Sequence, residues 1–126
     1  MKKVIHTSNA PKAIGTYSQA ILSNNTLYTS GQIAINPKNG DLITANISEE
    51  THQVMKNLEA VLLAAEMDFS NVLKCTIFLK DMNQYAEINA VYAQYFDEKP
   101  PAREAVQVSV LPKNVNIEIS LIANKS

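Results

Sequence analysis

The sequence predicts an α+β domain, with a mixed β-sheet and two helices packed on one face of it. Two segments repeat apolar residues at helical spacing, whereas other segments alternate apolar and polar residues as strands do. The predicted order is strand, strand, helix, strand, helix, strand, strand, with turn residues between the elements. With 126 residues, 46% of them hydrophobic, we expect one domain over residues 1–126 with its own core.

The first two strands are predicted to form a hairpin. Residues 18–23 and 27–33 have strand composition, and Asn24-Asn25-Thr26 between them suits a tight turn because asparagine tolerates positive φ. Residues 36–41 (Asn-Pro-Lys-Asn-Gly-Asp) have the composition of a surface loop.

An amphipathic helix is predicted from Ser48, where the period of the apolar pattern changes. Its apolar stripe consists of Val54, Leu58, Val61, Leu62 and Ala65. Ser48 is the predicted N-cap, and Glu49 and Glu50 put negative charge at the positive end of the helix dipole. Residues 67–71 end this helix.

The second half of the chain continues with strand, helix, strand and strand. In the strand over 72–80, one apolar face is formed by Leu73, Cys75, Ile77 and Leu79. A helix over about 83–96 ends at Pro100-Pro101, and its buried stripe is Tyr85, Ile88, Tyr92, Tyr95 and Phe96. Alternating residues then predict strands over 103–110 and 116–123.

The sheet face away from the helices is predicted to be a subunit interface. Alternation places small polar and apolar side chains there, namely Thr76, Phe78, Ala105, Gln107, Ser109, Ser120 and Ile122. This surface is too apolar for free solvent and too polar for a core, so we expect a homo-oligomer.

Composition excludes several classes of function. A formal net charge of −1 leaves no surplus for binding phosphate backbones, which makes nucleic acid a poor candidate partner. The three glycines are too dispersed for a glycine-rich phosphate loop, and Cys75, His6 and His52 are too few for a structural zinc site. Without an apolar leader or a stretch long enough to span a membrane, we expect a cytoplasmic protein that binds no metal.

Arg103 and Glu118 are the strongest candidates for chemistry, because alternation places both on the second sheet face. A guanidinium can hold a small carboxylate through two parallel hydrogen bonds, and a glutamate can position or deprotonate a water. The alternative is a structural ion pair at a subunit seam. If the last two strands were antiparallel neighbours, these residues would be roughly 16 Å apart. Either the strands are not neighbours, or a shared site is completed across an interface.

Five other residues are weaker candidates. His6 and His52 are predicted to be surface residues, and Cys75 to be inert packing in the core. Tyr17 is either a packing tyrosine, which the sequence favours, or a hydroxyl that reaches a ligand. Asn89 lies on the buried stripe of a helix, where its amide needs hydrogen-bond partners.

Eight stretches together carry a family pattern. They are residues 10–20 (Ala-Pro-Lys-Ala-Ile-Gly-Thr-Tyr-Ser-Gln-Ala), 28–33 (Tyr-Thr-Ser-Gly-Gln-Ile), 57–61, 74–82, 89–92, Pro101-Ala102-Arg103, Leu111-Pro112-Lys113 and Ile117-Glu118-Ile119. From end to end, the chain resembles the RidA (YjgF, also called L-PSP) family. The Ser-Gly-Gln, Pro-Ala-Arg and Ile-Glu-Ile motifs are specific in combination.

The resemblance implies a chorismate-mutase-like fold and a homotrimer whose sheets form a central barrel, with ligand clefts between subunits. It also implies hydrolysis of reactive enamines and imines, such as 2-aminoacrylate, 2-iminobutanoate and 2-iminopropanoate, to 2-oxo acids and ammonia without a cofactor. Carried over by position, Arg103 would clamp the substrate carboxylate and Glu118 would orient the attacking water. The residues that would shape the cleft are Tyr17, Ser30, Gly31 and Asn89.

Two positions depart from the family pattern. Thr16 stands where the family has proline, and Ala105 stands where the deaminases carry cysteine. Arg103 is retained, which favours the imine/enamine deaminase. One alternative is an endoribonuclease or translation inhibitor of the L-PSP type, against which the net charge and the lack of a histidine pair argue. The other is a non-catalytic small-ligand-binding or chaperone-like trimer.

Overall fold

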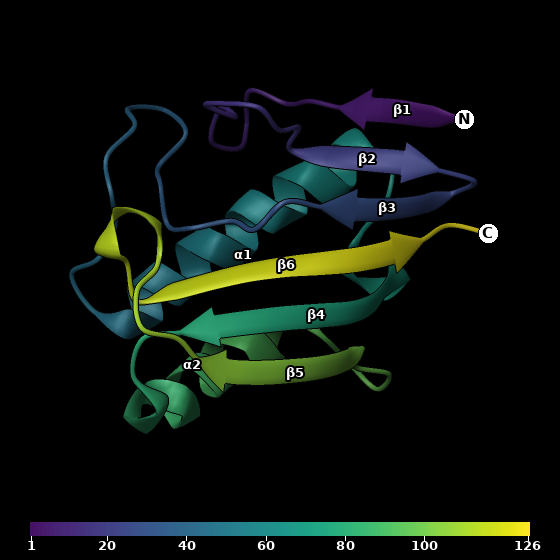
Figure 1. The fold of residues 1–126 in the computed structure, drawn as a ribbon. Coiled ribbons are helices and arrows are strands. Elements are labelled where there is room, and N and C mark those ends of the chain that lie inside the picture. The colour runs from purple at the N-terminus through teal and green to yellow at the C-terminus, as the bar shows by residue number, and fades with distance from the viewer.

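The computed structural model describes residues 1–126 as one six-stranded sheet with two helices behind it (Figure 1). The strands are β1 (Lys2–Ile5), β2 (Ala20–Ser23), β3 (Thr26–Thr29), β4 (Val72–Leu79), β5 (Ala102–Gln107) and β6 (Ile117–Asn124). The helices are α1 (Ile47–Ala64) and α2 (Tyr85–Tyr92). The strand order is β1-β2-β3-β6-β4-β5, and β4 and β5 form the parallel pair. This arrangement confirms the predicted mixed sheet with both helices on one face.

The predicted hairpin is confirmed, with shorter strands than expected. Asn24 and Asn25 make a two-residue turn, with φ values of 50° and 66°, a conformation that asparagine tolerates better than most residues. The predicted order of elements lacks β1, which lies at the edge of the sheet and pairs antiparallel with β2. The predicted second helix is shorter too, because α2 is flanked by 3-10 turns at Met82–Gln84 and Ala93–Tyr95.

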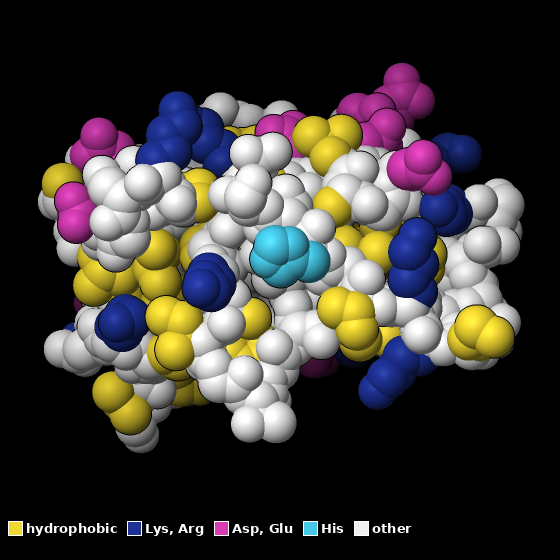
Figure 2. Space-filling view, turned by 90° about the horizontal axis from the view of Figure 1, so that it is seen from above, with side chains coloured by type: hydrophobic (Ala, Val, Ile, Leu, Met, Phe, Trp, Pro, Cys, Tyr) yellow, Lys and Arg dark blue, Asp and Glu magenta, His cyan; other side chains and the backbone are white.

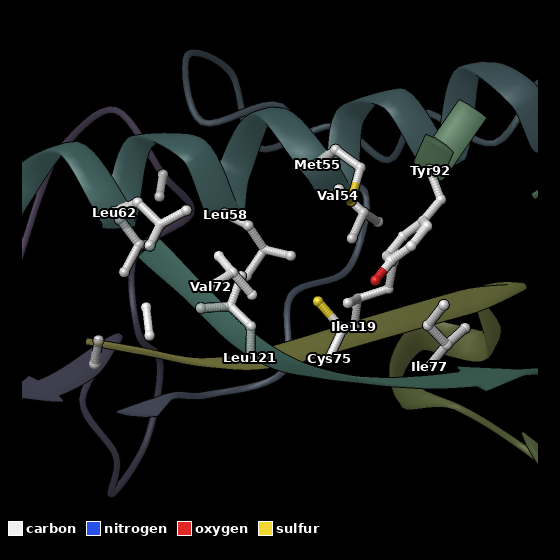
Figure 3. Packing of buried hydrophobic residues seen from close by; sticks show 14 of the residues in the cluster. Val54, Met55, Leu58, Leu62, Val72, Cys75, Ile77, Tyr92, Ile119 and Leu121 are labelled. Atoms are coloured by element: carbon white, nitrogen blue, oxygen red, sulfur yellow. The ribbon is translucent and has the colours of Figure 1, made fainter. Parts of the chain in front are cut away.

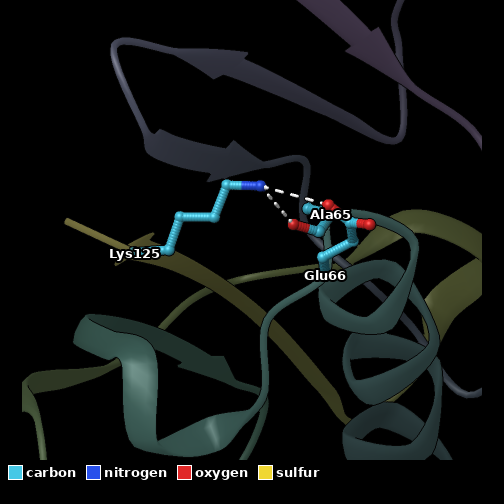
Figure 4. A network of polar contacts seen from close by, with 3 residues as sticks. All are labelled: Ala65, Glu66 and Lys125. Carbon is cyan, nitrogen blue, oxygen red and sulfur yellow. Dashed lines mark hydrogen bonds and ion pairs between the residues drawn. The ribbon is translucent and has the colours of Figure 1, made fainter.

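Helix α1 begins two residues earlier than it would with Ser48 as the N-cap. Asn46 is the N-cap: its extended backbone lets the side-chain oxygen accept from the Glu49 N–H at 2.9 Å, and its Nδ2 donates to Glu49 Oε2 at 2.7 Å. The prediction that Ser48 is the N-cap was therefore wrong. Asn46 and Ser48 are both good capping residues, and sequence alone does not decide between them. At the other end of the helix, Lys125 Nζ donates to the Ala65 carbonyl at 3.0 Å (Figure 4). Its positive charge interacts favourably with the negative end of the helix dipole.

The core lies between α1 and the sheet. In Figure 3, Val54, Leu58 and Leu62 of α1 point toward Cys75 and Leu121 of the sheet. Each of these side chains is buried. The alternation predicted for β6 is confirmed in full, because its residues alternate between buried and half-buried from end to end. In β4, a register shift between Val72 and Lys74 buries Val72 and leaves Leu73 exposed, contrary to prediction.

The predicted faces of β5 were wrong, because the register with β4 reverses them. Arg103 lies beside Cys75 and Ala105 beside Ile77, so both residues lie on the helix-covered face, and so does Gln107. Val106, in contrast, lies beside Phe78 on the open face. Neighbouring residues in a ladder share a face, which makes this assignment unambiguous.

The open face of the sheet carries apolar side chains that no element of the chain covers. They include Tyr28, Phe78, Val106 and Ile122, together with Thr76 and Ser120. Tyr28 is 49% exposed and Val106 is 45% exposed.

Neither helix is long and apolar enough to cross a membrane. From above (Figure 2), lysine and arginine side chains are separated by hydrophobic and polar ones instead of forming a continuous stripe.

Candidate functional site

A cavity of about 550 Å³ lies at the end of the sheet where β6 begins. Four of the residues that the family resemblance selected line it, namely Tyr17, Ser30, Gly31 and Glu118. Lys12 and Lys113 line it as well. The structure therefore brings together residues from the loop before β2, the segment after β3, and β6, which are far apart in the sequence.

Gly31 and Glu118 are packed directly against each other. Gln32 N donates to the Ile119 carbonyl at 2.9 Å, and Ile119 N donates to the Gln32 carbonyl at 3.2 Å. This bridge extends the sheet beyond β3 and places Gly31 beside Glu118. A Cβ on residue 31 would lie 2.7 Å from Cδ of Glu118, inside the van der Waals limit. A side chain at position 31 would therefore push the Glu118 carboxylate out of this position.

The carboxylate of Glu118 has neither a hydrogen bond nor an ion pair within the chain. The two ion pairs of the structure are Lys74–Glu104 and Lys125–Glu66, both away from the cavity. Partial burial raises the pKa of Glu118, because desolvation disfavours the charged form. An unpaired carboxylate with a raised pKa is suited to accept a proton from a bound water.

Ser30 and Tyr17 differ in how firmly they are held. Ser30 Oγ donates to the Ser18 carbonyl at 2.6 Å, and its backbone N–H donates to the Gln19 carbonyl at 2.9 Å. Tyr17 is 53% exposed at the rim of the cavity. The interpretation of Tyr17 as a packing residue was therefore wrong.

Arg103 and Asn89 lie in a second hollow, of about 460 Å³, between α2 and the start of β5. Arg103 Nη1 donates to Asn89 Oδ1 at 2.6 Å, and Nη2 donates to the Tyr85 hydroxyl. The guanidinium carbon also lies 5.0 Å from the centre of the Tyr92 ring. These contacts hold the Arg103 guanidinium in one orientation. They include no carboxylate, so the positive charge is available to an anionic ligand.

Arg103 and Glu118 do not meet within one chain. Arg103 lies beside Cys75 of β4, whereas Glu118 lies opposite Phe78, three residues further along the same strand. An odd separation puts them on opposite faces of the sheet. β5 and β6 are not neighbours either, because β4 lies between them. No ion pair between the two forms within the chain, and a site that uses both needs a second chain.

The remaining candidates divide between confirmed and corrected predictions. Cys75 is fully buried on the helix-covered face as predicted, and burial raises the pKa of its thiol. Tyr92 is buried beside it (Figure 3), and its hydroxyl has no hydrogen-bond partner. His6 is exposed as predicted. His52 is not a plain surface residue, since its Nδ1 lies 2.9 Å from the Tyr95 hydroxyl.

Residues that sequence reasoning missed surround both hollows. Tyr85 and Tyr92 hold Arg103, and the helical spacing of Tyr85, Asn89 and Tyr92 was a usable signal for a shared face. Lys113 lines the Glu118 cavity with a positive φ of 54°. Its only sequence signal was the Leu-Pro-Lys motif before the last strand.

Comparison with known proteins identifies the family to which this arrangement belongs. The family model described as Endoribonuclease L-PSP matches residues 7–125. The chain belongs to this family. Within the family, a RutC family protein of Pyrococcus horikoshii is 54% identical over 125 residues, covering 99% of each chain. The 2-iminobutanoate/2-iminopropanoate deaminase of Rattus norvegicus is 49% identical over 123 residues, covering 98% of this chain and 90% of the relative.

Solved L-PSP structures have the same fold. The crystal structure of Escherichia coli TdcF with bound serine superposes with a TM-score of 0.95 at 38% identity, covering 98% of this chain and 99% of TdcF. The fold of this L-PSP chain is therefore that of its relatives over nearly its whole length.

Proposed function

We propose that the protein is an imine/enamine deaminase, which hydrolyses 2-iminobutanoate, 2-iminopropanoate and related enamines to 2-oxo acids and ammonia. The observation that carries the proposal is the unpaired state of two charged groups: the Glu118 carboxylate in one hollow and the Arg103 guanidinium in the other. A 2-imino acid needs both, a cation for its carboxylate and a base for the water that attacks its imine carbon. The name of the rat relative, 49% identical, supports this chemistry.

The proposed cleft forms between chains of a homotrimer. Arg103 and Glu118 lie on opposite faces of the sheet, so the hollow around Arg103 of one chain would face the Glu118 cavity of its neighbour. The uncovered apolar residues of the open face, including Tyr28 and Val106, support association through that face.

Arg103 is the proposed carboxylate clamp. Asn89 and Tyr85 occupy one donor on each terminal nitrogen of its guanidinium and fix its plane, leaving other donors for two parallel bonds to a carboxylate. The serine bound to TdcF, a relative in this family, carries the same kind of carboxylate.

Glu118 is the proposed base. It takes a proton from water as the oxygen adds to the imine carbon, and the protonated carboxyl then gives this proton to the imine nitrogen, which becomes an amine. When the carbinolamine collapses, Glu118 takes the hydroxyl proton and gives it to the amine, the C–N bond breaks, and ammonia leaves the 2-oxo acid. The overall reaction therefore consumes only the imine and one water. Burial raises the pKa of Glu118 toward neutral pH, where a carboxyl group can both accept and donate a proton efficiently.

The other cleft residues have supporting roles. Gly31 admits the carboxylate of Glu118, Ser30 fixes the segment that carries Gly31, and Tyr17 offers a hydroxyl at the rim. Asn89 orients Arg103.

A coupled assay tests the proposal directly. An imine is generated in place by a pyridoxal-phosphate enzyme, and formation of 2-oxobutanoate or pyruvate is followed with and without the protein. We expect the protein to accelerate 2-oxo acid release, and light scattering to give a mass of three 13.9 kDa chains. No acceleration, together with cleavage of single-stranded RNA, would support the endoribonuclease alternative. No acceleration with tight binding of a 2-oxo acid would support a non-catalytic binding protein.

A further inference from the structure

Glu50 is a carboxylate with no exposed surface, in the first turn of α1. Both of its oxygens accept hydrogen bonds from one residue: Asn116 N donates to Oε2 at 2.8 Å, and Asn116 Nδ2 donates to Oε1 at 2.7 Å. No ion pair neutralises it. A buried carboxylate is costly unless it is fully hydrogen-bonded, so this pairing calls for an explanation.

Asn116 occupies the junction between two walls of the Glu118 cavity. Before it comes the turn Pro112–Asn114, whose Pro112 and Lys113 line the cavity. After it comes β6, with Glu118 as its second residue. Lys80 N also donates to the Asn116 carbonyl at 3.0 Å. The contact with Glu50 therefore ties α1 to the point where the cavity turn becomes the strand that carries Glu118.

The same arrangement recurs at two other walls of this cavity. Gln19 Nε2 donates to the Pro11 carbonyl at 2.9 Å. Asn57 Nδ2 donates to the carbonyls of Ile33 and Ile35 at 3.1 and 3.0 Å. Pro11, Ile33 and Ile35 all line the cavity. Three of the five buried polar side chains thus hold separate walls of one cavity.

We infer that Glu50 is a positioning residue for Glu118: by holding Asn116, it keeps the 112–116 segment in place as a wall of the cavity that Glu118 lines. The inference rests on the proposed function for the role of Glu118, but not for the geometry. When Glu50 is removed, the segment relaxes, water reaches Glu118, and the carboxylate loses both its desolvation and its alignment. The charged and titratable groups that share the cavity with Glu118 are Lys12, Lys113 and Tyr17.

Four variants separate positioning from charge and from stability. Glu50→Ala removes both hydrogen bonds, whereas Glu50→Gln removes the charge and keeps both bonds if the Asn116 amide turns over to accept one. Asn116→Ala keeps the charge of Glu50 and removes one bond, and it serves if Glu50→Ala does not fold. Thr51→Val is the matched control, because Thr51 is equally buried in the same turn and bonds only to Ile47 of its own helix.

The pKa of Glu118 is measured by NMR titration of its labelled side-chain carboxyl, and kcat/KM is measured with the imine assay. In Glu50→Ala we expect the pKa of Glu118 to fall toward the ordinary glutamate value and kcat/KM to fall about ten- to a hundredfold. We expect the same directions, with smaller changes, in Asn116→Ala. Glu50→Gln and Thr51→Val should leave both near wild type.

Two results would overturn the inference. One is an unchanged Glu118 titration in both Glu50→Ala and Asn116→Ala. The other is a pKa change in Glu50→Gln as large as in Glu50→Ala, which would mean that Glu50 acts by its charge. Because the titration does not depend on turnover, a wild-type protein without deaminase activity would refute the proposed function and still leave this inference to be decided.

Discussion

Arg103 and Glu118 are charged side chains without an oppositely charged partner, and this is the main residue-scale feature of the protein. Arg103 is held by Asn89 and two tyrosines, and Glu118 by contact with Gly31. Charges that are kept unpaired in hollows contribute little to folding, and this is why we propose an external ligand for them. Three predictions follow from how each charge is held.

Replacing Arg103 tests the carboxylate clamp. We expect Arg103→Ala to lose about 3 kcal/mol of transition-state stabilisation, or roughly a hundredfold in kcat/KM, because a bidentate charge-assisted contact is removed. Arg103→Lys should recover little, since an ammonium lacks the planar fork. Steady-state kinetics on the imine, with light scattering as a control for assembly, decide the matter. Dissociation of Arg103→Ala with full activity in the remaining trimer would show that Arg103 is structural.

Replacing Gly31 tests the packing against Glu118. In Gly31→Ala the new Cβ would collide with the end of the Glu118 side chain, which can swing away, so stability should change little while kcat/KM falls roughly tenfold or more. The same substitution in a Glu118→Ala background should fold without any penalty, because the clash is gone. A large stability cost that is the same in both backgrounds, measured by urea unfolding, would mean that Gly31 serves the backbone and not the carboxylate.

The raised pKa of Glu118 predicts a pH-dependent stability difference. Because the folded-state pKa lies above the ordinary value, the stability contributed by Glu118 is fully present below about pH 4 and is lost as pH rises through the folded-state pKa. Glutamine does not titrate. The unfolding free energy of Glu118→Gln, relative to wild type, should therefore increase from acidic to neutral pH. A difference that is constant with pH would contradict the desolvation of Glu118.

At the scale of elements, sequence periodicity predicted β4, β6 and α1 well and located β5, but it assigned the two faces of β5 the wrong way round. The valines of β5 were expected to face the helices, because alternation of apolar residues looks the same for a core as for an intermolecular interface. Pairing of Arg103 with Cys75, a long-range register, decides the face, and no local pattern contains it. The prediction that Leu73 is buried was wrong for a related reason. The register shift between Val72 and Lys74 changes which side chains face the core, and no local sequence pattern indicates it.

The start of α1 offers a test at this scale. Asn46 and Ser48 are both good capping residues, and the structure gives the cap to Asn46. Asn46→Ala should lower the unfolding free energy by about 1 kcal/mol, because the Glu49 N–H loses its acceptor. Ser48→Ala is the matched control and should change it by a few tenths of a kcal/mol at most. Chemical denaturation of both variants settles the cap, and the opposite ranking would place the helix start at Ser48.

At the scale of the whole molecule, the candidate site was predictable only in part. Family motifs selected Tyr17, Ser30, Gly31 and Glu118, and the fold gathers these four in one cavity. The same motifs selected Asn89 and Arg103, which the fold gathers in another hollow on the opposite face of the sheet. Sequence alone could not show this division, because it depends on β4 lying between β5 and β6. A cleft that contains both Arg103 and Glu118 must therefore lie between chains.

Subunit mixing tests this requirement most directly. Arg103→Ala and Glu118→Gln chains, each inactive alone, are unfolded together, refolded, and assayed for 2-oxo acid release, with each variant refolded separately as the control. If the cleft lies between chains and the two variants are mixed in equal amounts, an intact Arg103 meets an intact Glu118 at about a quarter of the interfaces, averaged over all trimers that form. We then expect the mixture to recover about a quarter of wild-type activity. A mixture as inactive as its two parents would contradict it.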